Sequence, residues 1–213
     1  MTATPTRVAP DVWVATRTRD LWCAGATHAE DLAAAELLPH PRRSEYLAGR
    51  ALLRHLLRLT VPEHADASVR TDGHGRPYLE GAPDTGISIS HDGDTVAAAV
   101  GRCHRVGVDV QLPAPSVPDG LLRRCLGPHA DHVRKLSARG RALELAWVWT
   151  VQEACVKAAG TGLSGSPWTI DVPPEHRRGT WGAYRWISLR DHSRTPLSCA
   201  YTRLDDARET TCS

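Results

Sequence analysis

The chain has 213 residues, of which 41% are hydrophobic and 23% are charged, a balance typical of a globular protein with one large or two small domains. Its formal net charge is only +2, which is too weak to indicate nucleic-acid binding by itself. No apolar run approaches the ~18 residues of a membrane span, and the N-terminus shows no apolar signal segment. We therefore expect a cytoplasmic protein that works without nucleic acid or membrane.

The six cysteines are scattered and form no Cys-x-x-Cys pair, which fits reduced thiols in a cytosolic protein. Cys125, His129 and His132 have a spacing that could suit zinc, but a fourth ligand is missing nearby. A structural zinc site stays open as an alternative.

The first half of the chain predicts one strand, two helices and then several strands. Val12–Ala15 reads as a strand, and the capping-box spacing of Thr27 and Glu30 opens a helix to Leu38. Pro39 ends that helix, and a second one follows over Arg42–Leu59. Period-two alternation then predicts strands at Ser68–Thr71, Arg76–Leu79, Ile87–Ser90, Thr95–Val100 and Val106–Val110.

The second half repeats this order after a proline-rich connector over Leu112–Gly120. Helices are predicted at Asp119–Leu126, Pro128–Arg139 and Arg141–Ala159. Weaker strands are predicted at Thr169–Val172, Ala183–Leu189 and Leu197–Thr202, and the last ten residues are expected to be frayed. Two rounds of strand, helices and strands indicate an α+β protein of two related halves, residues 1–104 and 105–213.

One candidate for chemistry is the strand around Asp109. Side chains alternate along a strand, so Val108 and Val110 would enter the core while Asp109 and Gln111 project together from the other face. The pattern alone favours the polar face of a half-exposed strand.

A second candidate is the helix that carries Trp149, Glu153 and Lys157 at steps of four. The ordinary interpretation is a surface ion pair worth about 0.3–0.5 kcal/mol. The alternative is a hard oxygen ligand and an ammonium group one turn apart, which could hold Mg²⁺ and a phosphate side by side.

The segment Ile87–His91 predicts buried isoleucines and outward serines, with His91 at the strand end. A histidine there is usually a solvated side chain, but it could also donate to a phosphate. The long first-half helix carries a row of arginines at helical spacing, namely Arg43, Arg50, Arg54 and Arg58. A solvated basic face is the favoured interpretation, and a row of guanidinium groups for a phosphorylated ligand is the alternative.

Four segments, taken in order, resemble the 4'-phosphopantetheinyl transferase superfamily, and the Sfp-type enzymes of polyketide and nonribosomal peptide systems in particular. They are Gly75-Arg76-Pro77, Ile87–His91, Gly107–Val110 and Trp149–Ala158. Arg50 also matches, and the resemblance covers about residues 10–190. Each segment alone is a weak signal, whereas four in the right order with suitable gaps are specific.

The resemblance implies an α+β fold in which two pseudo-symmetric halves clamp coenzyme A, with the active site at their interface. It implies Mg²⁺-dependent transfer of the 4'-phosphopantetheine arm of coenzyme A to a serine of an apo acyl, peptidyl or aryl carrier protein, with release of adenosine 3',5'-bisphosphate. Proteins of this type are usually monomers.

Roles for individual residues follow from the same resemblance. Asp109 and Glu153 would ligate Mg²⁺, and Glu153 would also help to deprotonate the carrier serine. Lys157 would touch a phosphate and assist the leaving group. The remaining coenzyme A contacts would come from Ser90 and His91, with His91 near the 3'-phosphate, and from Arg50 and Arg76 at the 3'-phospho-ADP end.

Two positions depart from the family pattern. Gln111 stands where glutamate is usual, and we expect either its carbonyl oxygen or a water in its place at the metal, with weaker Mg²⁺ binding. Gln152 stands where lysine is frequent, which leaves one phosphate or base contact open. These departures keep a rival in view, a non-catalytic module that binds coenzyme A or a carrier protein. Nucleic-acid binding by the arginine helix is a further alternative that the low net charge disfavours.

Overall fold

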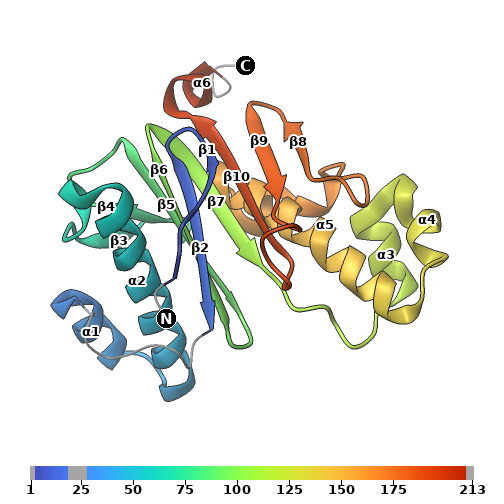
Figure 1. Cartoon of the computed structure of the whole chain (residues 1–213), viewed down its shortest axis with the longest axis horizontal. Coiled ribbons are helices and arrows are strands. Elements are labelled where there is room, and N and C mark those ends of the chain that lie inside the picture. The colour runs from blue at the N-terminus through green and yellow to red at the C-terminus, as the bar shows by residue number, and fades with distance from the viewer. Residues whose placement is uncertain (1–2, 19–27, 210–213) are drawn as a thin grey trace.

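The computed structural model describes residues 3–18 and 28–209. Within these ranges, eight strands form one sheet in the order β1-β2-β6-β5-β7-β10-β9-β8, and β3 pairs with β4 in a separate hairpin. Sheet neighbours are antiparallel except β5 and β7, which are parallel. The chain is therefore an α+β protein, and the parallel pair joins the strands of the first half to those of the second (Figure 1).

The elements of the first half follow the predicted order. They are β1 (Thr6–Ala9), β2 (Val12–Thr18), α1 (Ala29–Glu36), α2 (His40–Thr60), β3 (Val69–Thr71), β4 (Pro77–Leu79), β5 (Thr85–Asp92) and β6 (Thr95–Arg102). The predicted cap Thr27 lies outside the described residues, and the structure has His28 as the N-cap of α1. Strand β1 was missed by the sequence analysis.

The second half contains the longest helix of the described ranges. Its elements are β7 (His104–Val110), α3 (Asp119–Leu126), α4 (Ala130–Arg134), α5 (Ala138–Ala159), β8 (Arg178–Trp181), β9 (Tyr184–Ser188), β10 (Leu197–Arg203) and α6 (Leu204–Glu209). The predicted helix Pro128–Arg139 is interrupted, because α4 stops at Arg134 and the Ser137 hydroxyl caps α5 by accepting from the Gly140 amide. The tail forms α6 instead of fraying from residue 204, and β8 was also missed.

The predicted strand Thr169–Val172 is wrong. Residues Pro167–Thr169 form a 3-10 helix, and the chain then continues without a ladder partner. Ile170 and Val172 are 2% and 3% exposed because they pack into the core beneath α3 and α5. Alternating burial can thus arise from packing alone, without a sheet.

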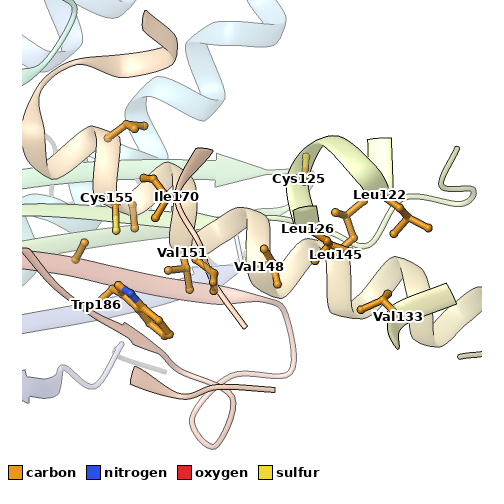
Figure 2. Packing of buried hydrophobic residues seen from close by; sticks show 14 of the residues in the cluster. Leu122, Cys125, Leu126, Val133, Leu145, Val148, Val151, Cys155, Ile170 and Trp186 are labelled. Atoms are coloured by element: carbon orange, nitrogen blue, oxygen red, sulfur yellow. The ribbon is translucent and has the colours of Figure 1, made fainter. Parts of the chain in front are cut away.

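Two helix-covered clusters hold the helices against one face of the sheet. In the first half, α2 packs leucines such as Leu53 and Leu56 on β6 residues including Ala98. In the second half, α5 packs Val151 and its neighbours on Trp186 of β9 (Figure 2). Trp147, Val151, Ala154 and Ala158 share one apolar stripe of α5, and all four side chains are buried.

A third cluster fills the opposite face of the sheet. It joins Val14 of β2 and Ala99 of β6 to Val108 of β7 and Cys199 of β10. Strands of both halves contribute to this cluster, so one core spans the junction between β5 and β7. Because Val108 points into this cluster, Gly107 and Asp109 face the helix side.

No helix in the portion of the chain that the structure describes combines the length and the apolar character that a membrane crossing needs.

Candidate active site

Asp109, Ser90 and Lys157 form a hydrogen-bonded group where α5 crosses β7 and β5, with Asp109 and Ser90 buried and Lys157 half-buried. Lys157 Nζ lies 2.6 Å from Asp109 Oδ1, and the Ser90 hydroxyl donates to the same oxygen at 2.8 Å. Lys157 also donates to Ser90 Oγ and to the Val108 carbonyl. Asp109 is only 6% exposed, so it is not the polar face of a half-exposed strand that the pattern alone favoured.

Gly107 explains why α5 can approach β7 so closely. A Cβ atom at this position would lie 2.0 Å from the Ala154 carbonyl oxygen and 2.5 Å from the Ala158 amide nitrogen. Only a residue without a side chain leaves room for the helix backbone there. Lys157 precedes Ala158 on α5, and Asp109 follows Gly107 by two residues on β7. The close contact at Gly107 therefore places Lys157 against Asp109.

Ser88 and Ser90 link β5 to β7 where the two strands separate. In the residues that the structure describes, β5 and β7 share a single ladder pair, Thr85 with His104. Beyond it, the Val108 amide donates to Ser88 Oγ and the Val110 amide to Ser90 Oγ. The prediction that these serines face outward is wrong, because their hydroxyls satisfy buried amides of the neighbouring strand.

Glu153 lies one turn before Lys157 on α5 and is half-buried. Its Oε1 atom is buried and accepts no hydrogen bond from the described part of the chain. Burial raises the pKa of Glu153, and the negative charge of Asp109 raises it further, while Lys157 opposes both. Burial likewise raises the pKa of Asp109 against the opposing effect of Lys157. Lys157 is thus ion-paired with Asp109, and its charge also acts on the nearby Glu153 carboxylate in a poorly solvated place.

This donor set fits a magnesium ion. Mg²⁺ prefers hard oxygen ligands, and proteins usually hold it with one or two carboxylates while substrate phosphates and waters complete the shell. A bound cation would give the unpartnered Oε1 of Glu153 a partner, and it would offset the negative charges that Glu153 and Asp109 place beside each other. Among the residues described, no group of three His, Cys, Asp or Glu side chains forms a complete metal cage, and the zinc alternative at Cys125 therefore gains no support.

A groove runs from α2 across β5 to this group. Arg50 and His91 line a cavity of about 600 Å³, and Arg76 and Lys157 line an adjoining one of about 170 Å³. The two cavities share lining residues, namely Gly75, Pro77 and Ile89. The groove therefore brings together three predicted cationic residues and His91, and His91 is exposed at its edge.

Arg50 faces this groove from α2. It is 7% exposed, lies 3.7 Å from Asp31 and stacks over the ring of Tyr46 at 5.0 Å. Its Nη1 atom is buried and has no hydrogen-bond partner in the described residues, which leaves one donor for a ligand. Arg76 stays cationic at neutral pH although burial and the charge of Arg105 lower its pKa, because arginine ionises far above neutrality.

Arg43 and Arg54 of α2 do not belong to the proposed row of guanidinium groups. Arg54 is fully buried, donates to Asp31 at 3.0 Å and also bonds the carbonyl oxygens of Ala65 and Ala67. Arg43 bonds two carbonyl oxygens at the end of α1. Arg54 is therefore not part of a solvated basic face either, since it anchors the loop before β3 to α1 and α2.

Neither glutamine that departs from the family pattern occupies a simple ligand position. Gln152 is fully buried and donates to the Cys125 and Ile170 carbonyls, so it ties α5 to α3 and to the chain after it. Gln111 donates through Nε2 to Asp92 Oδ2 at 2.7 Å. Its role as a metal ligand stays a prediction, with Oε1 as the atom left for it.

Asp92 was missed by the sequence analysis. Ser90 and Asp92 are two residues apart on β5, as Asp109 and Gln111 are on β7, and both cross-strand pairs bridge 19 positions. Pairing the two strands by this offset would have placed Asp92 beside Gln111.

Gln111 also lines an apolar pocket of about 250 Å³. Trp149 and Leu145 of α5 line it, together with Val117 and Leu121. The sequence placed Trp149 in line with Glu153 and Lys157 but gave no sign of this pocket, because the connector that closes it has no repeating pattern.

Two family models match the chain. The model described as "4'-phosphopantetheinyl transferase superfamily" matches residues 105–208, and the model of the "4'-phosphopantetheinyl transferase N-terminal domain" matches residues 30–101.

Individual proteins are similar as well. The 4'-phosphopantetheinyl transferase AcpT of Escherichia coli O157:H7 is 33% identical over 134 residues, which cover 61% of this chain and 63% of that protein. The 4'-phosphopantetheinyl transferase pptA of Paxillus involutus is 31% identical, over 55% of this chain and 52% of its own length. A 4'-phosphopantetheinyl transferase of Bacillus subtilis is 28% identical, over 47% and 44%. The matched region is thus less than two thirds of the length of these relatives.

Proposed function

Since this chain belongs to the 4'-phosphopantetheinyl transferase superfamily, we propose that it transfers the 4'-phosphopantetheine arm of coenzyme A to a serine of an apo carrier protein. The observation that carries the proposal is the convergence of Asp109, Glu153 and Lys157 at the end of a groove lined by cationic side chains. A diphosphate with an adjoining 3'-phosphate is a ligand that such a groove suits.

We propose that Asp109 and Glu153 hold Mg²⁺ on the coenzyme A diphosphate. The ion, when bound, would neutralise phosphate charge that otherwise repels the nucleophile. Arg50, Arg76 and His91 would bind the 3'-phospho-ADP end, and Ser90 would orient Asp109 and contact phosphate. Positioning and charge stabilisation of this kind supply most of the acceleration in phosphoryl transfer.

The proton of the carrier serine would pass to Glu153. The buried Oε1 atom accepts no hydrogen bond from the described residues, and the carboxylate has a second oxygen, so one oxygen could serve the ion and the other could accept the proton. The serine oxygen then forms a bond to the phosphorus of the arm, and the phosphoanhydride bond to the nucleotide breaks. Its electron pair leaves with adenosine 3',5'-bisphosphate, and Lys157 donates to the oxygen that gains charge.

The division into pseudo-symmetric halves, residues 1–104 and 105–213 with the site between them, belongs to the same proposal. The strand order β2-β6-β5 followed by β7-β10-β9 supports it, because each half places a strand, a long helix and an antiparallel pair in the same sequence order. The groove also draws on both halves, with Arg50 from α2 and Lys157 from α5. We further propose a cytoplasmic monomer that serves polyketide or nonribosomal peptide carriers.

Mass spectrometry of a panel of apo acyl, peptidyl and aryl carrier domains tests the function. With coenzyme A and Mg²⁺, at least one carrier should gain the mass of the 4'-phosphopantetheine arm. Asp109→Ala and Glu153→Ala should each slow this by about 100-fold or more while circular dichroism shows the fold retained. Coenzyme A binding without modification of any carrier would instead identify the non-catalytic module.

A further inference from the structure

The ends of β5 and β7 carry two matched cross-strand pairs. Ser90 donates to Asp109 at 2.8 Å, and two residues further along both strands Gln111 donates to Asp92 at 2.7 Å. Every second side chain of a strand points to the same face. Asp92 therefore pairs with Gln111 across the two strands in the same way as Ser90 pairs with Asp109. Asp92 therefore belongs to the same row of polar side chains as the proposed metal ligand Asp109.

The carboxylate of Asp92 is held through one oxygen only. Gln111 Nε2 and the Leu112 amide both donate to Oδ2, at 2.7 and 2.6 Å. No donor in the described residues reaches Oδ1. The other oxygen is thus oriented but unused, and Asp92 is close enough to Asp109 for their negative charges to repel each other.

We propose that Asp92 provides a third carboxylate for the cation site and that Gln111 is the residue that positions it. The proposal rests on the proposed function, because the cation is the Mg²⁺ expected of the family. It explains how a chain with a neutral residue at position 111 still surrounds the ion with three acidic side chains, Asp92, Asp109 and Glu153.

Asp92 acts on the ion across water and not as a direct ligand. The described part of the chain has no group of three His, Cys, Asp or Glu side chains that could hold a metal ion together. Mg²⁺ keeps several of its waters when it binds a protein, and carboxylates that bind those waters tune its affinity. Loss of such an outer partner lowers metal affinity by about 10–100-fold in other metalloproteins.

Mn²⁺ binding followed by electron paramagnetic resonance, with the full chain and no coenzyme A, tests this role. Asp92→Asn keeps an oxygen that can accept from Leu112 and removes only the charge, and we expect it to weaken Mn²⁺ binding about 10-fold. Asp66→Asn is the control for net charge, because Asp66 is an exposed acid in the loop before β3. It should leave the affinity unchanged.

Two further variants separate positioning from simple structural support. The double variant Asp92→Asn with Gln111→Glu, the exchange variant, moves the carboxylate from the end of β5 to the end of β7. It should restore Mn²⁺ affinity to within about threefold of the native protein. Gln111→Leu should weaken Mn²⁺ binding in the native background and add nothing when Asp92→Asn is already present, because both changes remove one interaction.

Native Mn²⁺ affinity in Asp92→Asn, or an exchange variant that binds no better than Asp92→Asn, overturns the proposal. Its failure is distinguishable from failure of the proposed function. If carriers are modified while Asp92→Asn binds Mn²⁺ normally, only the role of Asp92 is lost. If no carrier is modified but the Mn²⁺ pattern is as expected, the role of Asp92 stands and the transferase does not.

Discussion

Replacing Gly107 by alanine is the sharpest test of how the fold builds the site. The new Cβ would lie 2.0 Å from the Ala154 carbonyl oxygen, whereas real Cβ contacts essentially never fall below 3.0 Å. The obstacle is backbone in the middle of α5, so the helix has to move away from β7 by about 1 Å. Overpacking of this kind costs about 1–3 kcal/mol of unfolding free energy.

The same shift would separate Lys157 from Asp109, which are 2.6 Å apart in the native protein. A misplacement of about 1 Å can cost about 100-fold in rate. Urea denaturation would measure the stability loss, and carrier modification would measure the rate. Gly120→Ala is the matched control, because a Cβ at this exposed position of α3 meets nothing within 4 Å, and alanine there should stabilise the helix by about 0.5–1 kcal/mol.

A Gly107→Ala protein that unfolds at the native urea concentration and modifies carriers at the native rate would refute this reasoning. It would mean that α5 does not depend on Gly107 for its seat on β7.

Three other predictions concern separate parts of the molecule. The pKa of Glu153 is raised above its ordinary value of 4.5, so protons should displace Mg²⁺ at a higher pH than for a solvated carboxylate. Calorimetric Mg²⁺ titrations across pH should show affinity falling as pH falls through the raised pKa values of Glu153 and Asp109, and Glu153→Gln should reduce this pH dependence and remove most of the affinity. Arg54→Leu should destabilise the protein by about 3–5 kcal/mol, because it removes the nearer arginine partner of the buried Asp31 and the donor to the Ala65 and Ala67 carbonyls. A loss under about 1 kcal/mol in urea denaturation would contradict the buried pair. Burial raises the pKa of Cys199 to about 12, so iodoacetamide at pH 8 should label the exposed Cys103 and spare Cys199 until the protein unfolds. Equal labelling in the native state would contradict the packing of the sheet.

The sequence predicted best those elements whose apolar residues repeat with one period and pack into one core. The helix over Arg141–Ala159 and the strand around Val108 were predicted because their apolar residues repeat with a single period. The prediction for Ile170 and Val172 failed because burial against helices imitates the alternation of a strand. Short pieces such as β1 bury too few side chains to leave a pattern.

The site was only partly predictable for a different reason. The resemblance pointed to Asp109, Glu153 and Lys157, and the structure brings all three together. The burial of Ser90 and Arg54 could not be predicted from the sequence, because both are polar residues whose hydrogen-bond partners lie far away along the chain. These pairings depend on how β5 and β7 separate and on how the loop before β3 folds, and neither can be predicted from local sequence patterns.

The central claim is that one cation is shared by a carboxylate of β7 and a carboxylate of α5 on the diphosphate of coenzyme A. An anomalous difference map from crystals grown with coenzyme A and Mn²⁺ tests it most directly. The account predicts a single manganese peak within bonding distance of Asp109, Glu153 and the diphosphate. A peak bound to Asp109 alone with Glu153 turned away, or coenzyme A bound without any peak between these residues, would contradict it.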